Sequence, residues 1–360
     1  MSAELSNQNN IPLSRIDKLL DVLFSVSEIS YVRIYLKRHD FETSVNAEKT
    51  KIKILDQFSG KTPRKVQCTY ENLLKITKMM MLLGKHYCEF TKLNEIEFKF
   101  IDNKSSDIKI PETLFSKNFP FMVDKSLLKM SGMPVITAIE KKEKGVVFYF
   151  SMVRKKVIQV DVKKVDDGVL RHMAYDEEVK VQNIDTVYVP FGKNRAEFRI
   201  STEVPKKFID DQITRLKDAF FTLLEVNGMK VSNTTSVNVN KAIEKMYNTP
   251  GYGRVVETSF LSLDNGIVMP RSCRKDVQVC LRDQEYHKAG AEKESVKCVG
   301  LSIRWERVIK VIELKIRSEI QLESLPNLEY DYSTRFVLEN PAGMKQSLEW
   351  IDDIERAIIE

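Results

Sequence analysis

The chain has 360 residues, 42% of them hydrophobic and 30% charged, so it is long enough for more than one packed core and too apolar to be disordered throughout. Lysine and arginine number 57 against 51 aspartates and glutamates, and this net charge of +6 permits a nucleic-acid partner without requiring one. Five cysteines without paired spacing indicate free thiols, and the longest apolar run is too short to span a membrane, so we expect a cytoplasmic protein without a membrane partner.

The N-terminal third of the chain shows both helical and strand-like patterns. Residues 1–10 are polar and are expected to be disordered. Apolar residues recur at helical spacing over 14–24, and a second predicted helix over 69–84 follows a capping threonine and ends at a glycine. Alternation of apolar and polar residues predicts half-buried strands at 31–36, 51–55, 95–101 and 107–110.

The middle third has the clearest strand patterns. A short helix is expected from residue 124, and Pro205 fits the first turn of a long amphipathic helix that ends at Gly228. Between them, strands are predicted at 135–140, 146–152, 157–165, 179–189 and 196–200, with turns at 141–145, 153–156 and 191–194.

The last third follows a polar, β-branched tract at 231–240 that we interpret as a boundary. A short helix is predicted at 241–247, followed by strands at 255–263, 301–320 in two pieces, and 334–338. The terminal helix over 346–359 carries an apolar stripe of Leu348, Ile351, Ile354 and Ile358. The stripe is suited either to the core or to docking of a protein partner.

Together these elements predict an α+β fold of mostly antiparallel sheets with flanking helices, in helix-then-strand-pair units and two or three packed subdomains. We expect units at 11–120, at 121–230 (a β-meander plus the long helix) and at 231–360. Sliding clamps are built from repeated units of this kind. A clamp-like interaction or scaffold subunit of an oligomer is therefore one functional alternative.

The stretch CLRDQEYHKAG, from Cys280 to Gly290, suggests a second alternative. Arg282 and His287 within it resemble the R-x4-6-H motif of HEPN-family ribonucleases. The resemblance implies that Arg282 stabilises phosphate charge, that His287 acts as general acid or base, and that Asp283 orients them. The alternation in VQVCL instead favours a solvated strand end that turns near the histidine.

No metal or cofactor is expected. Cys273, Cys280, His287 and Cys298 could supply four zinc ligands, but residues seven apart stand about 10 Å apart along a helix and about 23 Å apart along a strand, too far for one ion. The sequence also contains no glycine-rich loop of the kinds that cradle nucleotide phosphates.

Basic residues gather at several predicted turns between strands, where they could converge on a phosphate backbone. Our leading hypothesis is therefore a non-enzymatic protein that binds DNA or RNA, within a larger assembly. A basic run at 37–39 adds to these clusters. Charged turns also serve simply to keep strand edges from associating. The candidate binding residues are Lys61, Arg64, Lys65, Arg154, Lys155, Lys156, Arg271, Arg274 and Lys275.

Overall fold

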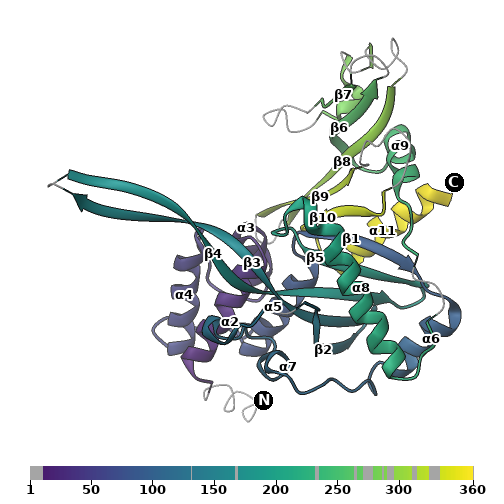
Figure 1. Ribbon diagram of the computed structural model, residues 1–360. Coiled ribbons are helices and arrows are strands. Elements are labelled where there is room, and N and C mark those ends of the chain that lie inside the picture. Colours follow the sequence, from purple (N-terminus) through teal and green to yellow (C-terminus); the bar gives the residue numbers. More distant parts are fainter. Residues whose placement is uncertain are drawn as a thin grey trace.

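A computed structural model gives the structure of the protein. It describes residues 11–130, 132–166, 169–231, 235–262, 266–270, 279–285, 288–289, 296–309, 314–323 and 333–359. The predicted α+β class is confirmed, because helices flank a sheet whose described strands pair only in the antiparallel sense (Figure 1). The expected disorder of residues 1–10 lies outside the described residues.

All ten described strands belong to one continuous sheet. The central strand β1 (His86–Lys92) pairs with β5 (Arg195–Ser201) on one side and with β10 (Arg335–Glu339) on the other, so the sheet draws strands from each third of the chain. The full order is β2 (Val135–Lys142), β3 (Gly145–Asp166), β4 (Val169–Pro190), β5, β1, β10, β9 (Leu314–Glu323), β8 (Val296–Ile309), β6 (Arg254–Ser262) and β7 (Gly266–Val268).

The N-terminal helices form a unit with its own core. They are α2 (Leu13–Val26), α3 (Ile29–Arg38), α4 (Ala47–Ser59) and α5 (Tyr70–Leu83). The helices predicted at 14–24 and 69–84 are confirmed, and the Thr69 side chain accepts a hydrogen bond from the Asn72 amide at 3.1 Å as an N-cap. Leu19, Leu73 and their apolar neighbours are fully buried between the helices.

All four strand predictions in this region were wrong. Residues 31–36 and 51–55 lie in α3 and α4, and residues 95–101 form α6 (Glu95–Lys104). Thr50, Ile54 and Gln57 are the buried positions of α4, a helical spacing, whereas Ile52 is 58% exposed. The predicted strand at 107–110 is also absent from this described segment, which is irregular.

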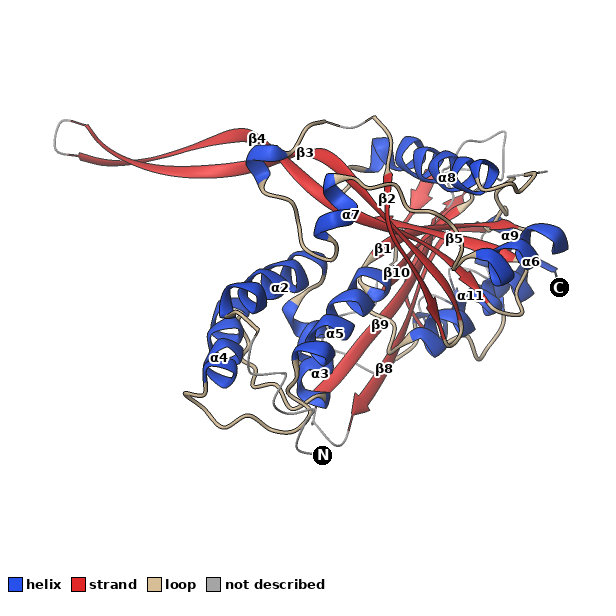
Figure 2. Cartoon of the chain, turned by 90° about the horizontal axis from the view of Figure 1, so that it is seen from below, coloured by secondary structure: helices blue, strands red, loops and turns tan. Residues whose placement is uncertain are grey.

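The turn predicted at 153–156 was wrong as well. β3 runs unbroken through these residues and pairs with β4 from Gly145 and Pro190 out to Asp166 and Val169. β2 follows β3 only as far as Ser151, and β5 pairs with β4 only at 186–188. The outer part of the hairpin, residues 154–166 and 169–181, therefore projects from the sheet as a two-stranded arm (Figures 1 and 2).

The remaining helices cover the sheet. α8 (Ile209–Val226) packs on one face, where the Phe220 ring lies 5.1 Å from Phe148 and 5.7 Å from Phe198 between centroids. The expected helix near residue 124 is a single 3-10 turn. The other elements are α7 (Leu114–Asn118), η2 (Lys125–Leu127), η3 (Lys206–Phe208), α9 (Asn240–Asn248), η4 (Leu281–Asp283) and α11 (Met344–Ile359).

The apolar stripe of α11 lies inside the protein. Ile351 and Ile354 are fully buried, and the Trp350 ring stacks on Trp305 at 4.5 Å between centroids. These side chains share a core with α9 and with β8 and β10 on the face of the sheet opposite α8. The stripe is therefore occupied by the chain's own core and not available to a partner in this fold.

A buried group of charges fastens α11 to the sheet. Arg195, Glu197 and Arg199 of β5 are at most 1% exposed. Glu197 accepts hydrogen bonds from Arg195 Nε at 2.9 Å and from Arg199 Nη2 at 2.6 Å, and Arg195 Nη1 also donates to Asp352 at 2.7 Å and Glu355 at 2.6 Å. Burial alone would lower the pKa of Arg195, but these carboxylates raise it above its usual value, so the guanidinium stays charged.

Candidate nucleic-acid interface

The fold brings two basic runs of the helical unit to one surface. The loop that carries Lys61, Arg64 and Lys65 follows α4, and its Lys65 ammonium lies 3.9 Å from the carboxylate of Asp40, just beyond the run at 37–39. The Gln57 side chain also donates to the Asp40 carbonyl oxygen at 3.3 Å, which ties α4 to the same turn. These contacts place residues 37–40 and 61–65 together.

A lysine of α5 belongs to the same surface. Burial is the main cause of a lowered pKa at His39, and the charges of Lys75 and Arg38 lower it further. The His39 ring therefore lies within the electrostatic reach of both cations. We define the basic surface as Arg38, Lys61, Arg64, Lys65 and Lys75. Lys75 was missed by sequence reasoning, because only the tertiary fold brings α5 beside residue 39.

Aromatic rings beneath the basic surface hold its two arginines. The Arg38 guanidinium lies 5.3 Å from the centroid of the Tyr35 ring, and that of Arg64 lies 5.3 Å from the centroid of the Phe58 ring. Such cation–π contacts fix a guanidinium in place without neutralising its charge. The rings face the cations and are not open platforms for bases, so the surface is suited to phosphate contacts.

The lysines of the basic surface are open to solvent. Lys61 pairs with Asp56 at 3.3 Å, yet its side chain is 74% exposed, and that of Lys65 is 73% exposed. Exposed pairs of this kind contribute at most about 1 kcal/mol and exchange readily for another anion. Both lysines can therefore exchange their carboxylate partner for a phosphate group at a small cost in free energy.

The predicted binding residues at the base of the arm are placed differently. Arg154 forms a two-pronged pair with the fully buried Asp185 and donates through Nε to Gln212 at 2.9 Å. Lys155 pairs with Glu178 at 2.8 Å and Lys156 with Glu203 at 2.7 Å. The charge of Arg154 is therefore compensated inside the fold, whereas the pairs of Lys155 and Lys156 are exposed.

Only two of the three predicted ribonuclease residues, Arg282 and Asp283, lie in the described part of the chain. His287 lies outside the described residues, as do Arg271, Arg274 and Lys275. Asp283 is exposed at the end of η4. Arg282 donates to the carbonyl oxygens of Tyr247 at 3.2 Å, Thr249 at 3.0 Å and Gly253 at 2.7 Å, and to Cys280 Sγ at 3.2 Å.

These contacts assign Arg282 a structural role, since its guanidinium fastens the 247–253 turn to η4. We expect Arg282→Ala to lower the free energy of unfolding by about 2 kcal/mol, because carbonyl oxygens lose a charged donor. Arg282→Lys should recover only part of this, since one ammonium cannot span the same acceptors. Urea unfolding measures the change. Asp283→Asn is the control, and unchanged stability of Arg282→Ala would exclude the structural role.

Neither a metal site nor a membrane helix is found in the described part of the chain. No group of three or more histidine, cysteine, aspartate or glutamate side chains is placed to hold an ion among those residues. The described helices are likewise too short or too polar to cross a bilayer. Cys280, which the zinc alternative required, accepts a hydrogen bond from the Val255 amide at 3.4 Å.

Comparison with known proteins identifies no relative of this chain. The chain matches no protein-family model, no curated protein and no solved structure. The resemblance to HEPN ribonucleases and the analogy with sliding clamps therefore rest on the sequence alone.

Proposed function

We propose that the protein is a non-enzymatic cytoplasmic protein that binds the phosphate backbone of nucleic acid through the basic surface. The observation that supports this most is the meeting of the 37–40 and 61–65 segments at the Lys65–Asp40 contact. Cations scattered over a surface repel one another weakly, whereas cations gathered on one surface neutralise neighbouring phosphates and release counterions.

The chemistry of the surface favours binding that does not depend on base sequence. Arg38 and Arg64 are held over aromatic rings, and Lys61, Lys65 and Lys75 are exposed. Contacts from such groups to phosphate oxygens position a protein on a strand but do not read its bases. DNA and RNA share this backbone charge, so both are ligands of the proposed surface.

Binding should depend strongly on salt. If the five cations of the basic surface each contact a phosphate, the logarithm of the association constant should fall with the logarithm of the salt concentration with a slope of about −4.5 for duplex DNA. Fluorescence anisotropy of a labelled oligonucleotide between 50 and 200 mM salt measures this slope. A protein that does not bind at the lower salt concentration would refute the proposal.

Neutralising two of these cations should have a defined effect. Arg64→Gln with Lys65→Gln should weaken binding by about tenfold and make the salt slope shallower by about 2, because two phosphate contacts are lost. The matched control is Lys155→Gln with Lys156→Gln, which removes the same charge from two exposed lysines that do not belong to the basic surface. Equal losses in both double variants would show that net charge, and not this surface, governs binding.

A further inference from the structure

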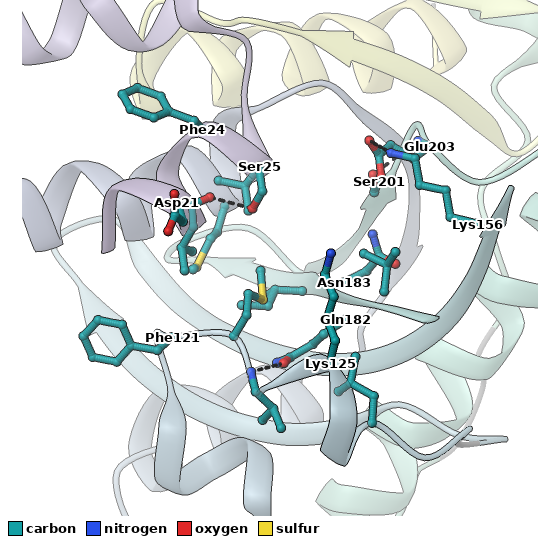
Figure 3. A pocket seen from close by; sticks show the side chains of 18 of the residues that line it. Asp21, Phe24, Ser25, Phe121, Lys125, Lys156, Gln182, Asn183, Ser201 and Glu203 are labelled. Carbon is teal, nitrogen blue, oxygen red and sulfur yellow. Dashed lines mark hydrogen bonds and ion pairs between the residues drawn. The ribbon is translucent and has the colours of Figure 1, made fainter. Parts of the chain in front are cut away.

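A hollow of about 780 Å³ lies beside the base of the arm, and no residue of the basic surface lines it. Its walls come from the second half of α2, the loop at 121–128, the inner part of the arm and the end of β5. Figure 3 shows Asp21, Phe24 and Ser25 on one side, with Lys125, Gln182 and Asn183 across from them. Its volume falls in the range of about 300–1,000 Å³ that is typical of small-molecule sites.

Much of the hollow is apolar. Its hydrophobic lining includes Val22, Phe24, Phe121, Met122, Val181 and Ile184. Several polar groups that also line it already have partners within the fold. Gln182 accepts a hydrogen bond from the Val123 amide at 2.7 Å and donates to Ser151 Oγ at 2.9 Å, and Ser25 donates to the Val22 carbonyl oxygen at 2.8 Å.

The acidic groups of the hollow are already compensated. Glu203 pairs with Lys156 at 2.7 Å and Asp21 with Lys51 at 2.5 Å. Asp124 accepts hydrogen bonds from the Ser126 side chain and amide, which together with the charge of Lys18 lower the pKa of its carboxyl. Lys85, a further cation of the lining, pairs with Glu339 at 2.7 Å.

Among the lining cations of the described chain, Lys18 and Lys125 form neither an ion pair nor a side-chain hydrogen bond. The charge of Lys18 acts on the Asp124 carboxylate and lowers its pKa, so the ammonium group of Lys125 is the one without a compensating carboxylate. The amide of Asn183, on the neighbouring strand wall, offers a further donor to the same space. One uncompensated positive charge therefore faces an apolar space.

We propose that this hollow binds an amphipathic organic monoanion, with a carboxylate or sulfonate headgroup on an apolar body. Lys125 contacts the headgroup through a charge-assisted hydrogen bond, Asn183 donates a second one, and the apolar body displaces water from the side chains of α2 and β4. The proposal is independent of nucleic-acid binding, because it uses no residue of the basic surface.

The test uses two fluorescent probes that differ in charge. The sulfonate 1-anilinonaphthalene-8-sulfonate should bind the folded protein saturably at one molecule per chain, and Lys125→Gln should weaken its binding by about tenfold. The neutral analogue N-phenyl-1-naphthylamine should bind the wild type and Lys125→Gln equally. Lys129→Gln, which removes an exposed lysine that does not line the hollow, is the matched control.

Val181→Asp provides a second variant, because it introduces a carboxylate into the apolar wall. It should weaken binding of both probes, and near-ultraviolet circular dichroism verifies that each variant remains folded. Absence of saturable sulfonate binding to the wild type would overturn the proposal. So would equal losses in Lys125→Gln and Lys129→Gln, or a loss of neutral-probe binding in Lys125→Gln as large as that of the sulfonate.

Discussion

Glu197→Gln should lower the free energy of unfolding by about 3–5 kcal/mol, the range found when one partner of a buried ion pair is removed. Glu197 is the carboxylate that neutralises Arg199, at 2.6 Å from its Nη2. The other partners of that guanidinium are neutral: the Leu82 carbonyl oxygen at 2.9 Å and Ser347 Oγ at 3.0 Å. The substitution keeps the shape of the side chain, so the loss reports charge and not volume.

Chemical denaturation of the variant, of Arg199→Gln and of the double variant forms a thermodynamic cycle for this pair. We expect a coupling energy of about 2 kcal/mol or more, since removing both charges leaves less uncompensated charge in the core than removing one. Glu95→Gln is the control, because it breaks an exposed pair with Lys99 and should change stability little. A coupling energy near zero would mean that the two side chains do not act as a pair.

Acidification from pH 7 to pH 4 should cost the wild type about 3 kcal/mol more stability than His86→Gln. Burial and, to a smaller extent, the nearby Arg199 charge lower the pKa of His86 to about 4, although hydrogen bonds to backbone carbonyl oxygens act to raise it. The ring is 5% exposed, and its Nδ1 lies 2.9 Å from the Gly84 carbonyl oxygen.

The direction of this effect follows from proton uptake. Above pH 6.5 His86 is neutral in both the folded and the unfolded chain, so it contributes no pH dependence. Between about pH 6.5 and pH 4 the unfolded chain binds a proton that the folded chain does not, and the free energy of unfolding falls by about 1.4 kcal/mol per pH unit. Urea titrations of both proteins at several pH values measure the difference. Parallel profiles would contradict a neutral buried His86.

Local sequence signals determined the elements that carry a strong periodic pattern. The helices at 14–24, 69–84 and after Pro205 were predicted correctly, because each presents a long apolar face. α6 was predicted wrongly although its signal was present. Asn94 and Glu97 form a capping box, in which the Asn94 side chain and the Glu97 amide lie 2.8 Å apart and the Glu97 carboxylate accepts from the Asn94 amide at 2.8 Å. The alternation over 95–100 is typical of a strand, but the capping box at its start favours the helix that forms.

The turn predicted at 153–156 was wrong for a different reason. Three consecutive basic residues are typical of a turn, yet in β3 they continue a strand. Arg154 points inward to Asp185, and Lys155 and Lys156 pair with acidic residues on neighbouring segments. The partners at 178, 185 and 203 are distant in sequence, so no local pattern could identify them. Arg154, whose charge is compensated by the buried Asp185, is therefore a weak candidate for phosphate binding.

By itself, the sequence determined the fold class, the approximate bounds of the helices with a strong apolar face, and most of the cationic residues of the proposed basic surface. Local periodicity, capping residues and charge are short-range properties, so they can be read from neighbouring residues. Only the tertiary structure decided which cations act together: Arg64 and Lys65 beside residues 38–40, Arg154 against Asp185, and Arg282 within a backbone turn. Compensation of charge depends on residues far apart in the chain, and packing alone brings these together.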